Sequence, residues 1–205
     1  MTVVGVLLAG GRSRRMGGGD KALRQLAGVT LLDRVIARMR PQVERLVLNA
    51  NGDPARFADY GLPVVADSVP GFAGPLAGVL AGLDWAAAHA PACRYVVSAA
   101  TDAPFLPADL VGRLMQELAA DGADLACAAS GGRSHPVFGL WPVGLKEELR
   151  RAVVEDGTRK VDVFTARYKL ATVTFSDRPA DPFFNVNRPE DFAAAATLAA
   201  ASETA

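Results

Sequence analysis

Near its N-terminus the chain reads Val3-Val4-Gly5-Val6-Leu7-Leu8-Ala9-Gly10-Gly11-Arg12-Ser13-Arg14-Arg15-Met16-Gly17, an apolar run followed by a loop of glycine and arginine residues. The uninterrupted apolar run over residues 3–8 is typical of a strand that is buried on both faces. The paired glycines that follow allow backbone N–H groups to approach an anion closely, and the arginines and Lys21 add positive charge. We therefore expect a first strand that leads into a phosphate-binding loop.

This loop differs from two common phosphate-binding motifs. Neither G-x-x-x-x-G-K-[ST] nor G-x-G-x-x-G can be aligned with it. Among its cations, Lys21 is the expected partner of a triphosphate. Arg15 is expected to clamp a phosphate or to pair with a carboxylate, whereas Arg12 and Arg14 face solvent or attract anions from a distance.

Length, charge and cysteine content narrow the class of protein. The 205 residues predict a single domain over residues 1–205, and the balance of 22 basic and 22 acidic side chains gives no support for nucleic-acid or membrane partners. The first apolar run is short and contains Gly5, so we expect neither a signal peptide nor a membrane span, and a cytoplasmic protein. Cys93 and Cys127 are expected to be buried, reduced thiols without a metal.

The rest of the chain alternates apolar strand-like runs with amphipathic helices, which predicts an α/β fold of three layers with a mainly parallel central sheet. Thr30 is predicted to cap the first helix, over residues 31–40. The expected strands are 3–8, 45–50, 62–66, 95–100, 124–129, 136–141 and 171–175, and the later helices are 75–89, 108–120, 144–154, 161–168 and 189–201.

Polar residues follow four of the expected strands. They are Gly10, Asn49, Asp67 and Asp102, and ligands bind at this carboxyl edge in open α/β sheets. Each alone is also a common turn-former, but together with the first loop they predict a binding site. A lone carboxylate such as Asp102 suits Mg²⁺, which takes one or two carboxylates plus phosphate oxygens and water.

Three motifs in their order along the chain carry a resemblance to a known family. They are the first loop with Lys21, the G-P-L-A-G turn at residues 74–78, and F-x-N-V-N-x-P-E-D at residues 183–191. The sequence resembles the MobA-type molybdenum cofactor guanylyltransferases from residue 3 to residue 192. The resemblance implies a Rossmann-like nucleotidyltransferase fold whose N-terminal half binds GTP and whose C-terminal half binds molybdopterin.

The activity that the resemblance implies is transfer of GMP from GTP to molybdopterin, with release of pyrophosphate. It implies catalytic roles for Lys21, Asp102 and Arg15, and a magnesium ion on Asp102. The implied GTP-binding residues are Leu8, Ala9, Gly10, Gly11, Lys21, Asn49, Asp67, Gly78 and Asp102. The implied molybdopterin-binding residues are Arg159, Asn185 and Asn187.

Asp67 is expected to accept hydrogen bonds from the N1–H and N2–H₂ edge of guanine, which cytosine and adenine do not offer. Purely structural or surface roles also stay open for three residues. Asn187 is also a plausible helix cap, Arg159 a surface charge, and His135 a residue of a structural turn.

Other functions also stay open at this point. The chain could be a molybdopterin cytidylyltransferase or a sugar-phosphate nucleotidyltransferase, which a preference for CTP, UTP or ATP would reveal. It could also be a non-catalytic GTP sensor or a delivery partner, which an absence of pyrophosphate release would reveal. Molybdoenzyme apoproteins and cofactor-insertion proteins are further partners under the resemblance.

Overall fold

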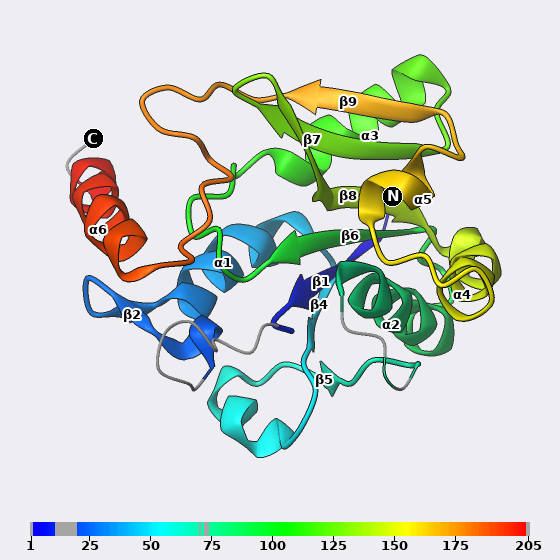
Figure 1. Cartoon of the computed structure of the whole chain (residues 1–205), viewed down its shortest axis with the longest axis horizontal. Helices are drawn as coiled ribbons and strands as arrows, with labels where there is room; N and C mark the ends of the chain where they lie inside the picture. The colour runs from blue at the N-terminus through cyan, green and yellow to red at the C-terminus, as the bar shows by residue number, and fades with distance from the viewer. Residues whose placement is uncertain (1, 11–19, 70, 72–73, 204–205) are drawn as a thin grey trace.

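A seven-stranded sheet forms the centre of the molecule (Figure 1). The structure is a computed structural model that describes residues 2–10, 20–69, 71 and 74–203. The strand order is β5-β4-β1-β6-β8-β7-β9, and all neighbours are parallel except for the two pairs that include β8. The strands are β1 (Val3–Leu8), β4 (Arg45–Asn49), β5 (Val64–Val65), β6 (Tyr95–Ala100), β7 (Leu125–Ser130), β8 (Arg133–Pro142) and β9 (Leu170–Thr174).

Helices cover both faces of this sheet, which confirms the predicted three layers. Helices α1 and α3 lie on one face of the sheet, and α2, α4 and α5 lie on the opposite face (Figure 1). The apolar side chains of the first set pack in one core, and those of the second set pack in another. The C-terminal helix α6 lies beside a small hairpin of β2 and β3. The bounds are α1 (Leu31–Met39), α2 (Pro75–His89), α3 (Leu110–Asp121), α4 (Lys146–Val154), α5 (Val161–Thr165), α6 (Pro189–Glu203), β2 (Gln25–Leu26) and β3 (Val29–Thr30).

Local sequence signals explain where several elements begin. The Thr30 hydroxyl accepts a hydrogen bond of 3.0 Å from the Asp33 N–H, so Thr30 caps α1 as predicted. Gly131 and Gly132 have φ values of 53° and 74° and join β7 to β8, because a two-residue hairpin of this kind needs left-handed backbone at both positions. This turn makes β8 antiparallel to its neighbours.

Close packing of α2 on the sheet requires two glycines on one helix face. A Cβ at Gly82 would lie 2.8 Å from the Cβ of Val6, and one at Gly78 would lie 2.7 Å from Cδ2 of Leu8. Residues four apart share a helix face, so the pair lets the helix axis approach β1 directly. The N-terminus of α2 therefore lies at the carboxyl edge of the sheet.

Some predicted elements differ from those in the structure. The strand expected over residues 62–66 is reduced to Val64–Val65, and the helix expected over residues 161–168 ends at Thr165 in turns that are bonded i to i+3. The β2–β3 hairpin and the 3₁₀ helix Pro54–Tyr60 were not predicted, since both are too short or too polar to show a periodic apolar pattern. Within the described part of the chain, no helix has the length and hydropathy needed to cross a membrane.

Candidate functional site

Four neighbouring parallel strands bring the predicted polar residues to one edge of the sheet. β5, β4, β1 and β6 all point the same way, so Asp67, Asn49, Gly10 and Asp102 follow their carboxyl ends in that order. Backbone bonds connect these ends: the Ala9 N–H donates to the Asn49 carbonyl at 2.9 Å, and the Thr101 N–H donates to the Leu8 carbonyl at 3.3 Å. The residues form a continuous rim.

Asp67 is held by two asparagines at the β4–β5 end of this rim. Its Oδ1 accepts from Asn49 Nδ2 at 3.0 Å, and its Oδ2 accepts from Asn51 Nδ2 at 2.7 Å. Asn51 Oδ1 also accepts from the Asp67 N–H at 2.9 Å. Because each carboxylate oxygen has two acceptor positions, Asp67 keeps acceptor capacity while its orientation is fixed.

Gly78 packs against Asn49, one of the two asparagines that hold Asp67. Asn49 is buried, with 3% of its surface exposed, and its Oδ1 occupies the space that a Cβ on Gly78 would take. Leu8 closes the other side of that space. The structure therefore places Gly78 where it lets α2 pack on Asn49.

Lys21, Asp102 and Asn187 form a second group at the β6 end of the rim. Lys21 Nζ lies 2.7 Å from Asp102 Oδ2, and it also donates to Asn187 Oδ1. The side chains of Lys21 and Asp102 are 14% and 25% exposed, so the ion pair is partly shielded from water. The backbone N–H of Val186 donates to the Asp102 carbonyl at 2.9 Å and holds the C-terminal segment against this turn.

The second oxygen of the Asp102 carboxylate suits a metal ligand. Among the residues that the structure describes, Asp102 Oδ1 is the buried side-chain polar atom that has no hydrogen-bond partner. An orphaned carboxylate oxygen needs a partner to offset its desolvation. In the same part of the chain, no group of three His, Cys, Asp or Glu side chains could hold a metal, so a cation on Asp102 would take its other ligands from phosphate and water.

The three residues expected to bind molybdopterin do not form one cluster. Asn187 contacts Lys21, and Val186 packs with Leu26 and Leu31 on the α1 side of the sheet. Arg159 precedes α5 on the α2 side, where its carbonyl oxygen would lie 3.6 Å from a Cβ on Gly74. The asparagines and Arg159 therefore flank the site.

The alternative role of Asn187 as a helix cap is wrong. The helix α6 begins at Pro189, and its first turn is capped by Asp191, whose Oδ2 accepts from the Asn187 and Arg188 N–H groups at 2.7 and 2.8 Å. The Asn187 side chain is therefore available to Lys21.

The first loop is described only in part. Leu8 and Ala9 lie half-buried at the end of β1, and a Cβ on Gly10 would meet open space. The described residues do not include Gly11, Arg12, Arg14 and Arg15.

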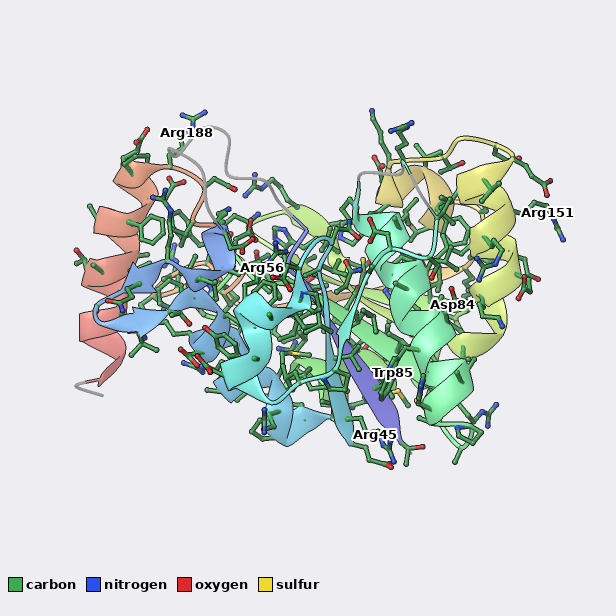
Figure 2. The ribbon with its side chains drawn as sticks, turned by 90° about the horizontal axis from the view of Figure 1, so that it is seen from below. Arg45, Arg56, Asp84, Trp85, Arg151 and Arg188 are labelled. Carbon is green, nitrogen blue, oxygen red and sulfur yellow. The ribbon has the colours of Figure 1, made fainter. Side chains whose placement is uncertain are left out.

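Sequence reasoning missed one ion pair at this edge. Arg56 Nε lies 2.9 Å from Asp20 Oδ2, and the same guanidinium donates to the Asn51 carbonyl at 2.5 Å (Figure 2 labels Arg56). Arg56 thus connects the residue before Lys21 to the asparagine that orients Asp67. The sequence did contain one signal that Asn51 lies beside Asn49. The two asparagines are two residues apart, and alternate residues face the same way along an extended chain.

A polar network beside Asn185 was also missed. The Ser130 hydroxyl donates to Asp181 Oδ1 at 2.7 Å and lies 2.7 Å from His135 Nε2. His135 lies inside β8, so its interpretation as a turn residue is wrong: the turn is complete at Gly132. Burial lowers the pKa of His135, against an opposing contribution from Asp181.

Comparisons with known proteins give matches that extend over most of the chain. A family model described as the MobA-like NTP transferase domain matches residues 5–170. A protein named molybdenum cofactor guanylyltransferase from Bradyrhizobium sp. (strain ORS 278) is 65% identical over 97% of this chain and 93% of its own length. One of the same name from Nitrobacter hamburgensis is 61% identical over 96% of this chain and 94% of its own.

Solved structures show the same fold. Molybdopterin-guanine dinucleotide biosynthesis protein A from Archaeoglobus fulgidus superposes with a TM-score of 0.76 at 24% identity, over 97% of this chain and 99% of that one.

Proposed function

The chain belongs to the MobA-like NTP transferase family, and on that premise we propose that it transfers GMP from GTP to molybdopterin, forming a guanine dinucleotide and pyrophosphate. The observation that carries the proposal is the rim of the sheet. It sets a fixed carboxylate, Asp67, at one end and a lysine–carboxylate pair, Lys21 and Asp102, at the other. Relatives that are 61–65% identical over nearly their full length bear the guanylyltransferase name.

Asp67 is the proposed base-selecting residue. Its two oxygens keep acceptor positions beyond the bonds from Asn49 and Asn51, and the guanine edge presents N1–H and N2–H₂ together. Cytosine and adenine lack this pair of donors and would leave the remaining acceptor positions of the partly buried Asp67 carboxylate without a partner. Asp67 would therefore both favour guanine and disfavour the other bases.

Lys21 and Asp102 are the proposed phosphate and metal residues. The unbonded Asp102 Oδ1 would hold Mg²⁺, which supplies charge neutralisation at the triphosphate when bound. Lys21 Nζ lies 2.7 Å from this carboxylate, where it would also contact a phosphate oxygen of the bound triphosphate. Asn187 Oδ1 accepts a hydrogen bond from the same ammonium group and helps to hold it in place.

The proposed reaction needs no covalent enzyme intermediate. The terminal phosphate of molybdopterin attacks the α-phosphorus of GTP, a new P–O bond forms, and the bond to pyrophosphate breaks. Because the attacking phosphate is already an anion, no general base is required. The protein aligns the two substrates and offsets the negative charge on the phosphates. Lys21 offsets part of this charge directly. Molybdoenzyme apoproteins or cofactor-insertion proteins would receive the product.

An isosteric substitution tests this assignment. Asp102→Asn keeps the shape of the side chain but removes the charge that would hold the metal, and Asp109→Asn makes the same change at an exposed position without a capping bond. We expect Asp102→Asn to lose pyrophosphate release with GTP, Mg²⁺ and molybdopterin, and Asp109→Asn to match the wild type. Equal turnover in the two variants would contradict the proposal.

A further inference from the structure

A pocket of about 340 Å³ lies next to the candidate site, between the start of β8 and the segment that leads to α6. Its lining includes Arg133, His135, Asp181, Phe184 and Asn185. In Figure 1 this orange segment runs from β9 past the sheet towards α6, and the bond between Ser130 and Asp181 fastens it to the end of β7.

Hydrogen bonds fix one oxygen of Asp181 and leave the other available. Asp181 Oδ1 accepts from the Ser130 hydroxyl at 2.7 Å and from the Phe183 N–H at 2.9 Å, which fills both of its acceptor positions. No described residue bonds to Asp181 Oδ2. The carboxylate is therefore held rigidly, with one oxygen free for a ligand.

The same network sets the proton on His135. The single hydroxyl proton of Ser130 is given to Asp181, so the 2.7 Å contact with His135 Nε2 requires the imidazole to donate its Nε2–H to Ser130 Oγ. In the neutral ring, Nδ1 is then an acceptor, and the lowered pKa of His135 favours that neutral ring. Asp181 Oδ2 and His135 Nδ1 thus add two acceptors to a pocket whose lining also includes the guanidinium donors of Arg133 and the amide of Asn185.

Aromatic rings complete the pocket. The ring of His135 lies 4.9 Å from that of Phe183, and half-buried Phe184 adds a second apolar wall. Acceptors beside aromatic rings suit a planar heterocycle that carries adjacent N–H donors. A 2-amino-pyrimidin-4-one edge is such a group, with an amino group and a ring N–H side by side.

The position of the pocket relative to Asp102 fits the two ends of one substrate. Residues 181–186 join the pocket to Val186, which bonds to the Asp102 carbonyl, and five residues span at most about 18 Å. Molybdopterin carries a phosphate at one end and a pterin with an amino-pyrimidinone edge at the other. Its phosphate at Lys21 and its pterin in the pocket would place both ends on polar partners.

We propose that Asp181 and His135 bind the amino-pyrimidinone edge of the pterin and select the acceptor substrate. This inference rests on the proposed function. Guanine and the pterin both present a ring N–H beside an amino group. The chain then has one fixed carboxylate for each of them, Asp67 for guanine and Asp181 for the pterin. The dinucleotide product contains both edges.

Steady-state kinetics with two isosteric variants distinguish the two carboxylates. Asp181→Asn keeps the Oδ1 acceptor and replaces Oδ2 with a donor. We expect it to raise the KM for molybdopterin by about 10- to 100-fold, the range for loss of a charged hydrogen-bond partner, and to leave the KM for GTP unchanged. Asp67→Asn should raise the KM for GTP alone. Asp177→Asn, an exposed change in the same segment, should alter neither KM.

A rise in the KM for GTP with Asp181→Asn, or no change in the KM for molybdopterin, would overturn the inference. Either result leaves the proposed function standing, since the wild type still forms the dinucleotide. A wild type that forms no dinucleotide contradicts the proposed function instead.

Ligand-observed NMR tests the pocket without turnover, and its main comparison uses the wild-type protein alone. Pterin and lumazine differ in that lumazine has an oxygen in place of the 2-amino group. We expect the wild-type protein to bind pterin at least about tenfold more tightly than lumazine, since an oxygen would face Asp181 Oδ2. His135→Gln should weaken pterin binding. Equal binding of the two ligands would contradict the role of Asp181 even if a variant failed to fold.

Discussion

Substitution of Gly78 by alanine tests whether α2 must approach Asn49 as closely as the structure shows. An added Cβ would lie 2.7 Å from Cδ2 of Leu8 and would also overlap Asn49 Oδ1. Overpacking of this kind costs about 1–3 kcal/mol. Moving Asn49 breaks bonds of a buried amide, at a further cost of about 1–3 kcal/mol. The better helix propensity of alanine offsets about 1 kcal/mol of this.

The net expectation for Gly78→Ala is a loss of about 1–5 kcal/mol in the free energy of unfolding. In a chain of this length each kcal/mol lowers Tm by about 2–4 °C. Because Asn49 also orients Asp67 through the 3.0 Å bond, the Kd for GTP should rise at least about fivefold.

Thermal denaturation and calorimetric titration with GTP measure both effects. Gly112→Ala on α3 is the matched control, because a Cβ at that exposed position meets no atom within 4 Å. It should stabilise the protein by about 0.5–1 kcal/mol and leave GTP binding unchanged. If Gly78→Ala is as stable as Gly112→Ala and binds GTP as tightly as the wild type, the packing argument is refuted.

Three further predictions follow from the site. Lys21→Gln should lower kcat/KM for GTP by about 10- to 100-fold in a pyrophosphate-release assay, while the control Lys146→Gln on α4 should not; equal losses would remove Lys21 from the site. A chelator should abolish turnover and added Mg²⁺ should restore it; turnover that resists chelation contradicts a metal on Asp102. The free energy of unfolding should fall below about pH 6.5, because the unfolded chain protonates His135 more readily than the folded chain does. Urea denaturation between about pH 5 and pH 7.5 should show a smaller fall in His135→Gln, and an unchanged pH slope would refute this.

The parts of the fold that the sequence predicts are those with strong local signals. The apolar run of β1, the Thr30 cap of α1 and the proline that starts α2 each act within a few residues. The carboxyl-edge position of Asn49 and Asp102 follows from the strand boundaries once a parallel sheet is expected.

Contacts between distant segments could not be predicted in this way. Ser130 and Asp181 are 51 residues apart in sequence, and Asn51 and Asp67 are 16 apart. Nothing in the sequence around these residues indicates their partners, because a single polar side chain shows no periodicity. The β2–β3 hairpin, with two residues in each strand, is also below the length at which alternation is visible.

Asn187 shows how one residue can fit two local interpretations. Its place before a proline and two acidic residues is typical of a helix cap, yet Asp191 supplies the capping carboxylate from inside the helix. The free amide of Asn187 then reaches Lys21, which is 166 residues away in sequence. Only the three-dimensional arrangement distinguishes the two roles.

A competition assay among the four nucleotides tests whether the protein transfers GMP from GTP to molybdopterin. The wild-type protein, molybdopterin and Mg²⁺ are incubated with equal amounts of GTP, CTP, ATP and UTP, and mass spectrometry identifies the dinucleotide that forms together with pyrophosphate. We expect molybdopterin guanine dinucleotide to be the main product and Asp67→Asn to lower its share. A cytosine dinucleotide as the main product would contradict the assignment of Asp67 to guanine, and pyrophosphate release without any dinucleotide would contradict transfer to molybdopterin.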